Sequence, residues 1–226
     1  MTDAPATVLR RAAAHVLVDD VTAPALTDQQ LHHVFRVLRV RDGESVTVTD
    51  GRGRWRACRA SGNSIEPDGE PGSVPRRSTP ITIGFAVPKQ DRPEWIVQKL
   101  TELGVDRIVV LHAERSVVRW TADRAAKHLD KLRRVASEAL QQSRHVWLPE
   151  IAGPVAARDF LPGAVAAEPG GRAITSGDTT LAIGPEGGWT DDELGAATAT
   201  VAVGSTVLRV ETAAIVTASR ALLYAE

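Results

Sequence analysis

Two short segments near the end of the chain carry the residues best suited to binding a ligand. They are Leu181-Ala-Ile-Gly-Pro-Glu-Gly-Gly188 and Val203-Gly-Ser-Thr-Val-Leu-Arg-Val-Glu-Thr-Ala213. Their glycines permit positive φ and leave backbone amide and carbonyl groups open to a ligand. A phosphate loop would ordinarily add a lysine after the glycines, and none follows Gly188. The pattern therefore favours a cationic or neutral ligand held by backbone groups, while a purely structural tight turn remains the alternative.

The elements around these segments would place both of them at one edge of a sheet. Each follows a short apolar run, predicted as a strand over Thr180 to Ile183 and over Val201 to Val203. A helix then follows each loop: Thr190 is a predicted N-cap with Glu193 three residues later, and another helix runs from Ala213 to Leu223. Strand-loop-helix units of this kind bind ligands at the carboxyl edge of a parallel sheet.

The rest of the second half repeats strand and helix. Strands are predicted over Ile81 to Val87, over Arg107 to Leu111 and near Ala173-Ile-Thr175, with helices over Pro93 to Leu103 and Ala122 to Gln142. This rhythm predicts an α/β fold, in which helices cover both faces of a parallel sheet.

The first third differs in composition and pattern. Residues 6 to 70 form short apolar runs with turns at Asp42-Gly43 and Asp50-Gly51, which indicates a small β-barrel or sandwich with a short helix over Gln29 to Val37. The breaker-rich stretch after Glu66 is a predicted linker. We therefore expect two domains, residues 1–73 and 74–226.

An arginine-rich stretch lies within the predicted β-domain. Between Leu31 and Arg59 there are seven arginines and three acidic residues, and Trp55 stands among them. Arginine pairs with phosphate through two parallel hydrogen bonds and stacks on bases, so this stretch is a candidate RNA surface. A solvated domain surface is the alternative reading of the same charges. The candidate RNA-binding residues are Arg36, Arg39, Arg52, Arg54 and Arg56.

The composition of the chain limits its possible partners, its compartment and its metal content. The net charge of −1 argues mildly against a nucleic-acid partner, because such domains are typically basic. The single cysteine, Cys58, excludes an internal disulfide and fits the reducing cytosol, so we expect a cytoplasmic protein. No apolar run approaches a membrane span, and the scattered histidines indicate no metal site.

The two glycine-bearing segments resemble the C-terminal motifs of the RsmE family, the 16S ribosomal RNA uridine-N3 methyltransferases of the SPOUT superfamily. The resemblance extends over almost the whole chain. It includes Leu31-His-His-Val-Phe-Arg-Val-Leu-Arg39 and Lys89, the segment from Gln98 to Gly104, and Glu114-Arg-Ser-Val117. One departure lies after the long helix, where Gln142-Ser-Arg-His145 places an arginine one position earlier than in many relatives.

The resemblance implies a trefoil-knot domain preceded by a PUA-like β-barrel, and S-adenosyl-L-methionine as the cofactor. It also implies a homodimer that methylates uridine N3 of 16S rRNA within the small ribosomal subunit. The implied cofactor-binding residues come from both segments: Ile183, Gly184, Pro185, Glu186, Gly187, Gly188, Val203, Gly204, Val207, Leu208, Arg209, Thr212 and Ala213.

Methyl transfer of this kind requires alignment of the reactants and removal of the uracil N3 proton. The candidate catalytic residues are Arg209 and Glu211 in the second segment, together with Arg115 and Arg144 near predicted element ends. These arginines could stabilise a uracil anion or neutralise RNA phosphate, and ordinary surface or bracing roles remain open. The residues do not identify the general base.

Two other functions are compatible with the sequence. A related SPOUT enzyme acting on tRNA or on a ribose 2′-hydroxyl would use the same cofactor loops. A non-catalytic RNA-binding assembly factor would keep the fold without the chemistry.

Overall fold

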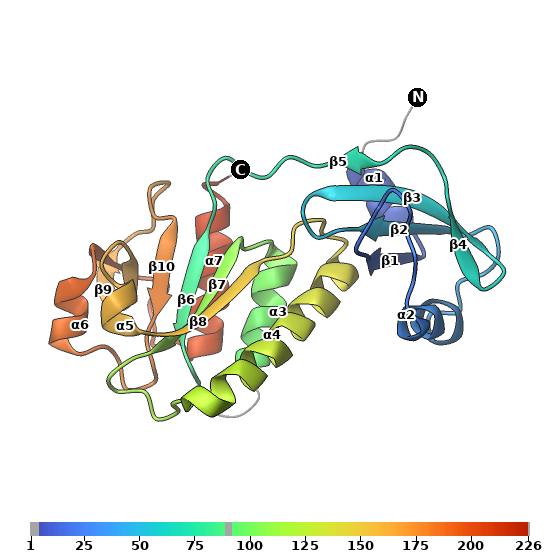
Figure 1. Cartoon of the computed structure of the whole chain (residues 1–226). Coiled ribbons are helices and arrows are strands. Elements are labelled where there is room, and N and C mark those ends of the chain that lie inside the picture. Colours follow the sequence, from blue (N-terminus) through green and yellow to red (C-terminus); the bar gives the residue numbers. More distant parts are fainter. Residues whose placement is uncertain (1–4, 89–91, 226) are drawn as a thin grey trace. The chain divides into compact units, whose positions relative to one another are not determined.

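The computed structural model describes residues 5–88 and 92–225 and divides into two compact units (Figure 1). The first unit contains the residues up to Arg76 and a later segment, Ser137–Leu148. The second unit contains Arg77–Ala136 and the chain from Pro149 onward. No sequence pattern predicted that residues 137–148 would belong to the first unit. Lys89 lies outside the described residues.

The first unit is built on a five-stranded sheet in the order β1-β2-β3-β4, with β5 paired to β3. β1 is parallel to β2, whereas the other pairs are antiparallel. The elements are α1 (Pro5–Arg11), β1 (Ala14–Leu17), α2 (Asp28–His32), the π-helix η1 (His33–Val37), β2 (Ser45–Thr49), β3 (Arg54–Ser61), β4 (Ser64–Pro67) and β5 (Gly72–Ser73).

Both faces of β2 are buried. Val46 and Val48 belong to the apolar core of this unit, which also contains Cys58. The threonine of the other face, Thr47, is equally buried, and its Oγ1 lies 2.8 Å from Nδ1 of His15. The His15 ring in turn donates from Nε2 to the carbonyl of His145 at 2.9 Å. The later segment 137–148 is thus bonded to β1, which explains why it belongs to this unit.

Local signals in the first unit were predicted well. The predicted helix over Gln29 to Val37 is present as α2 followed by η1. Thr27 caps it in a capping box with Gln30. Both predicted Asp-Gly turns carry a glycine at positive φ, 80° at Gly43 and 69° at Gly51.

The second unit contains a six-stranded sheet in the order β11-β9-β10-β6-β7-β8, in which every neighbouring pair is parallel. The predicted α/β class is confirmed. The strands are β6 (Thr82–Ala86), β7 (Arg107–His112), β8 (Glu150–Ala156), β9 (Val165–Arg172), β10 (Thr180–Ile183) and β11 (Ala199–Val201). The helices are α3 (Arg92–Leu103), α4 (Ala122–Ser143, whose last turns belong to the first unit), α5 (Ala157–Phe160), α6 (Asp191–Ala196) and α7 (Val210–Leu222).

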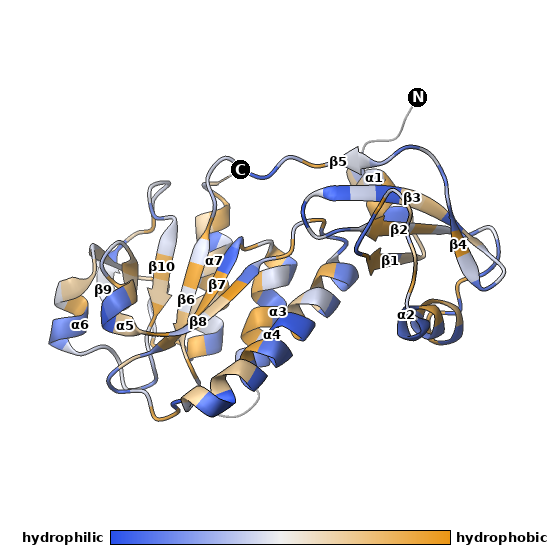
Figure 2. Cartoon of the chain, in the orientation of Figure 1, coloured by the Kyte–Doolittle hydropathy of each residue, from blue (hydrophilic) through white to orange (hydrophobic). Residues whose placement is uncertain are grey.

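Helices cover both faces of this sheet (Figure 1). On one face, α5 and α6 pack over a cluster that includes Leu111, Ala182 and Trp189. On the other face, α7 packs against β6, β10 and α3. The α3 and α4 helices are joined by an ion pair, in which Lys131 Nζ lies 2.6 Å from Glu94 Oε1. Figure 2 shows hydrophobic residues along the strands, as expected for a sheet buried on both faces.

The structure corrects three details of the sequence reading. The strand expected near Ala173-Ile-Thr175 ends instead at Arg172, and residues 173–179 form a loop held by Asp178. The strand expected at Val201 to Val203 lies at Ala199–Val201. The short elements β8 and α5 were not predicted, because β8 contains Gly153-Pro154, a pair that indicates a turn.

None of the helices in the described ranges is long and apolar enough to span a bilayer.

Candidate functional site

The two glycine-bearing loops follow β10 and β11 at the carboxyl edge of the parallel sheet. The predicted capping box is present: Thr190 Oγ1 accepts from the Glu193 amide, and the Thr190 amide donates to Glu193 Oε2 at 3.0 Å. The second loop leads into α7, for which Arg209 is the N-cap. We expected these loops on adjacent strands, but β9 lies between β10 and β11.

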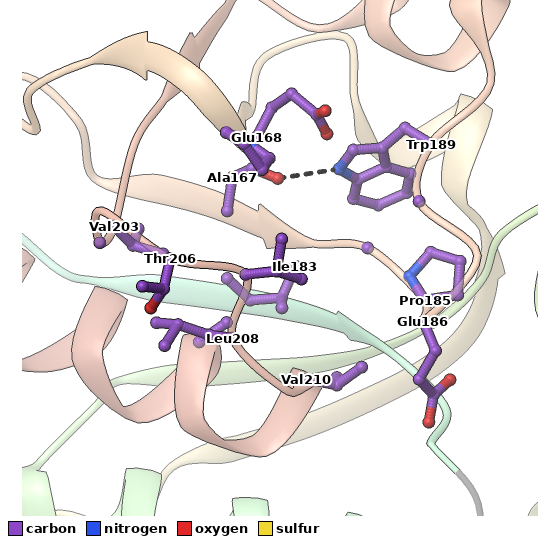
Figure 3. A pocket seen from close by; sticks show the side chains of 16 residues that line it. Ala167, Glu168, Ile183, Pro185, Glu186, Trp189, Val203, Thr206, Leu208 and Val210 are labelled. Carbon is purple, nitrogen blue, oxygen red and sulfur yellow. Dashed lines mark hydrogen bonds between the residues drawn. The ribbon is translucent and has the colours of Figure 1, made fainter.

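A cavity of about 200 Å³ opens between these loops (Figure 3). β9 forms the third wall of the cavity. Its pairing with β10 ends at Ala167 and its pairing with β11 resumes at Arg172, so residues 168–171 bulge out of the ladder between them. The lining residues are Ala167, Glu168, Pro169, Ile183, Gly184, Pro185, Glu186, Gly188, Trp189, Val203, Gly204, Thr206, Val207, Leu208, Val210 and Ala213.

Most of the predicted cofactor residues line this cavity. Gly187, Arg209 and Thr212 do not. The sequence reading missed the β9 wall, because it placed the strand eight residues too late. It also assigned no site role to Trp189, a buried aromatic whose Nε1 donates to the Ala167 carbonyl at 3.2 Å. Whether these residues bind a cofactor stays a prediction.

The glycines of the first loop have three different roles. Gly188 has a φ of 71°, and a Cβ there would meet nothing within 4 Å, so this residue shows bare backbone to the cavity. A Cβ on Gly184 would lie 2.9 Å from the Trp189 ring, so glycine allows the indole to pack beneath the loop. A Cβ on Gly187 would lie 3.2 Å from Cβ of Arg115. Gly187 therefore faces a protein side chain and not the cavity.

The loop after β7 is fastened to the first glycine loop from two directions. Arg115 Nη1 donates to the Trp189 carbonyl at 2.9 Å and to the Gly187 carbonyl at 3.4 Å. Glu193, which is 2% exposed, accepts the Glu114 amide on Oε1 at 2.9 Å. Arg115, a predicted catalytic residue, thus has a visible role in positioning the cavity-lining loop.

The first turn of α7 carries the other candidate charges of this unit. Arg209 is exposed, and its guanidinium has no hydrogen-bond or ion-pair partner among the described residues. Glu211 Oε1 lies 3.5 Å from Nη1 of Arg92, and its Oε2 is buried without a partner in the described part of the chain. The ion pair of Glu211 is therefore made with α3, and not with Arg209 as the bracing alternative assumed.

Arg144, the fourth predicted catalytic residue, belongs to the first unit. It has a φ of 61°, and its Nη2 donates to the carbonyl of Ala12 at 3.1 Å. Burial lowers the pKa of its guanidinium. These contacts give Arg144 a structural role in holding the two segments of this unit together.

The predicted RNA-binding arginines of the first unit fall into two groups. Arg36, Arg39, Arg52 and Arg54 are exposed, and none of their guanidinium groups makes a hydrogen bond or ion pair within residues 5–88 and 92–225, although the charge of Arg54 acts on the nearby Asp20 carboxylate. Arg56 is different, because its guanidinium donates to the carbonyls of Thr22 at 2.7 Å and Gly69 at 2.8 Å. Arg39 has a positive φ of 57°, in the left-handed region that residues other than glycine rarely adopt. In the described ranges, no cluster of histidine, cysteine and acidic side chains could hold a metal ion.

Comparison with known protein families defines the class. A model described as RNA methyltransferase domain matches residues 75–222, and a model described as RNA methyltransferase PUA domain matches residues 26–61. The chain is an RNA methyltransferase by family. It is 31% identical to Ribosomal RNA small subunit methyltransferase E of Mycobacterium tuberculosis, over 87% of this chain and 85% of that protein. The protein of the same name from Synechocystis is 31% identical, over 83% of this chain and 69% of its own length. This protein belongs to the ribosomal RNA small subunit methyltransferase E family.

Solved structures agree with this assignment. A Ribosomal RNA small subunit methyltransferase E from Neisseria gonorrhoeae, solved with bound S-adenosyl methionine, is similar with a TM-score of 0.75 and 25% identity. The similarity covers 91% of this chain and 95% of that one. A probable rRNA-methyltransferase from Porphyromonas gingivalis is similar with a TM-score of 0.73 and 27% identity, over 94% and 98% of the two chains.

Proposed function

We propose that this protein transfers the methyl group of S-adenosyl-L-methionine to N3 of a uridine in 16S rRNA of the small ribosomal subunit. The observation that carries this proposal is the cavity between the loops after β10 and β11, with backbone on one side and apolar side chains on the other. The bound S-adenosyl methionine of the Neisseria gonorrhoeae structure and the names of the relatives support it.

The cavity residues fit this cofactor. Ile183, Leu208 and Val210 present an apolar surface suited to a flat adenine, as Figure 3 shows for their side chains. Gly188 leaves open space where any other residue would place a Cβ. The carboxylates in the wall suit the positive charge of a sulfonium, and the absence of a lysine after Gly188 disfavours a phosphate ligand.

When bound, the cofactor supplies an electrophilic methyl group on a positively charged sulfur. The residues of the chain must then align the uracil and stabilise the anion left when N3 loses its proton. We propose Arg209 for this role, and its exposure and its position between the cavity residues Leu208 and Val210 support the proposal. Glu211, two residues after Arg209, is oriented by Arg92. Arg115 holds the loop after β10, which lines the cavity.

The finer features of the fold belong to the same proposal. We propose that the second unit contains the trefoil knot of SPOUT methyltransferases and that the first unit is a PUA-like barrel. In support of the knot, the chain reaches the sheet edge at β11 and then returns to pack α7 on β6 and β10. In support of the barrel, β1 pairs with β2, and β5 pairs with β3 in addition to the strand order β1-β2-β3-β4.

The proposed substrate also implies partners and location. The exposed arginines of the first unit, led by Arg36, Arg39, Arg52 and Arg54, are proposed to bind rRNA phosphates. A homodimer is proposed because apolar side chains are exposed at the C-terminal end of α7, where Leu223 is 73% and Tyr224 is 55% exposed. An enzyme that modifies ribosomal RNA would act in the cytoplasm.

The test is methylation of purified small ribosomal subunits, naked 16S rRNA and tRNA, with mass-spectrometric mapping of the product nucleoside. The proposal expects 3-methyluridine in ribosomal RNA. Product in tRNA or on a ribose 2′-oxygen would replace the proposed substrate with that of a related enzyme. Cofactor binding without methylation of any of these RNAs would favour an assembly factor.

A further inference from the structure

The side chains around the cavity have an unbalanced charge. Two of the lining residues, Glu168 and Glu186, are carboxylates, and none is a lysine, arginine or histidine. Neither carboxylate has a hydrogen-bond or ion-pair partner in the part of the chain that the structure describes. The cavity wall therefore carries two negative charges that no lining residue among those described neutralises.

The arginines on the segments around the cavity do not line it, and Arg172, four residues after Glu168, is paired with Asp178. Arg115 directs its guanidinium to two carbonyl groups of the first loop, and Arg92 is paired with Glu211. Arg209 flanks the cavity but is exposed and absent from its lining. Among the described residues, the charged side chains that a ligand in the cavity would contact are therefore carboxylates.

Glu168 is the better placed of the two. Glu168 is half-buried, whereas Glu186 is exposed, and in Figure 3 the two side chains extend from opposite sides of the labelled group. Its neighbours Ala167 and Trp189 are joined by a hydrogen bond, which fixes this part of the wall. A half-buried carboxylate is costly to leave without a partner, so a positive charge in the ligand would be stabilised there.

We propose that Glu168, assisted by Glu186, makes this site select the cationic methyl donor over its neutral demethylated product. This inference rests on the proposed function. In the transfer, the bond between sulfur and the methyl carbon breaks and its electron pair stays on sulfur. A bond forms from N3 of the uracil to the methyl carbon, and the N3 proton passes to a base or to water. The sulfonium of charge +1 becomes a neutral thioether, so the attraction to both carboxylates weakens at the moment of transfer.

The consequence is that the site should bind the methyl donor more tightly than the demethylated product. The donor, S-adenosylmethionine, has a net charge of +1, whereas the product, S-adenosylhomocysteine, has a net charge of zero. The two differ by one methyl group and one charge, and an apolar wall alone would distinguish them only by the methyl. The two carboxylates therefore favour exchange of product for fresh donor.

The experiment measures dissociation constants by calorimetry for three ligands: the donor, the product, and sinefungin, which replaces the methyl-bearing sulfonium with an amine-bearing carbon and keeps the positive charge. The proteins are the wild type, E168Q, E186Q, the double variant, and D192N as a control. Asp192 is an exposed carboxylate on α6 outside the cavity lining, so D192N changes net charge without changing the wall.

We expect the ratio of product to donor dissociation constants to fall about fivefold in E168Q, the factor given by about 1 kcal/mol for two charges about 4 Å apart in high dielectric. The fall should be smaller in E186Q, largest in the double variant and absent in D192N. Sinefungin should follow the donor, and product affinity should stay near wild type, which also shows that the variants are folded. Added salt should weaken donor binding more than product binding in the wild type.

An unchanged ratio in the double variant would overturn the inference, as would sinefungin behaving like the product. Failure of the proposed cofactor has a different signature, because the wild-type protein would then bind neither the donor nor the product, and failure of the proposed substrate would show only in the methylation assay.

Discussion

The cavity of the second unit and the arginine surface of the first unit are built from different parts of the chain. The cavity uses backbone and short side chains from three loops, whose positions follow from the parallel sheet beneath them. The arginine surface uses long side chains such as Arg36 and Arg54, which extend from a helix and a strand into solvent. A backbone site is fixed by the fold, whereas a side-chain surface is fixed mainly by which charges remain unpaired.

The difference explains why similar-looking residues have unequal roles. In the cavity, Gly187 and Gly188 are neighbours, yet only Gly188 lines it. In the surface, Arg54 and Arg56 are two residues apart, yet the Arg56 guanidinium is bonded to two carbonyls, whereas the Arg54 guanidinium makes no hydrogen bond among the described residues. Residue type gives the candidate, and only geometry gives the role.

The largest expected effect follows from filling the cavity backbone. Gly188→Val would place a branched side chain in open space lining the site, at a φ that L residues rarely adopt. We expect S-adenosylmethionine affinity to fall by about a hundredfold, equivalent to about 2.7 kcal/mol, with calorimetry as the measurement. Gly163→Val is the matched control, because Gly163 also has positive φ and open surroundings but lies outside the lining. Equal loss of affinity in both variants would show that backbone strain alone is responsible.

The next effect separates chemistry from cofactor binding. Arg209→Ala should slow rRNA methylation by at least about tenfold, because one anion-stabilising donor is typically worth about a hundredfold in turnover. Cofactor affinity should stay within a few-fold of wild type, since Arg209 does not line the cavity. The measurements are single-turnover methylation and calorimetry on the same preparation.

Arg220→Ala is the control for this variant, because Arg220 is an exposed arginine in the last turn of the same helix. A joint fall of cofactor affinity, thermal stability and rate in Arg209→Ala would favour a bracing role. Unchanged turnover would remove Arg209 from the mechanism.

A smaller effect concerns the arginine surface. Replacing Arg36, Arg39 and Arg52 together with alanine should weaken RNA binding and flatten its salt dependence by about 0.7 to 0.9 logarithmic units per lost phosphate contact. Cofactor affinity should not change. A second triple variant, Arg124, Arg134 and Arg158 to alanine, removes the same charge from exposed positions outside the first unit. If that variant alone flattens the salt slope, the RNA surface lies elsewhere.

A separate prediction, on stability and not on binding or turnover, contrasts the acid stability of the two units. Burial is the main cause that lowers the pKa of His15 to about 4, and the nearby Arg144 charge adds to it. The folded state thus holds His15 neutral, while the unfolded chain takes up a proton below about pH 6.5. Stability of the first unit should therefore be complete above pH 6.5 and fall by up to about 1.4 kcal/mol per pH unit as the pH drops toward 4.

In the second unit, the bond from Arg172 is the main cause that lowers the pKa of Asp178 to about 2. Its contribution is present above about pH 4 and is lost as the pH falls toward 2. Hydrogen exchange followed by mass spectrometry reads both units in one sample. The variant His15→Gln should lose the transition of the first unit between pH 6.5 and 4. The variant His32→Gln, at an exposed position, should keep that transition. A single transition common to both units would contradict the assignment.

Much of the second unit could be predicted because its signals are local. The capping box at Thr190, the C-terminal stop at Gly104 with its φ of 82° and the strand Thr180–Ile183 all depend on neighbouring residues. The β9 wall could not be predicted in the same way, since Glu168-Pro-Gly-Gly171 has the composition of a turn and joins the cavity only through the pairing of β9 with β10 and β11. The Arg92–Glu211 pair and the bonds of Arg115 also join distant parts of the sequence, so spacing gave no indication of them.

The departure of residues 168–171 from β9 also bears on how such enzymes diverge. The strand leaves the sheet after Ala167 and rejoins it at Arg172, while a Cβ on Gly171 would lie 2.6 Å from the backbone of Thr200 and Val201. Gly171 is therefore constrained, whereas Glu168 and Pro169 are free of the ladder and still face the cavity. Insertions, deletions and substitutions between these anchors would alter one wall of the site without disturbing any strand pairing. This excursion is a place where natural variation can retune ligand preference while the rest of the architecture is inherited unchanged.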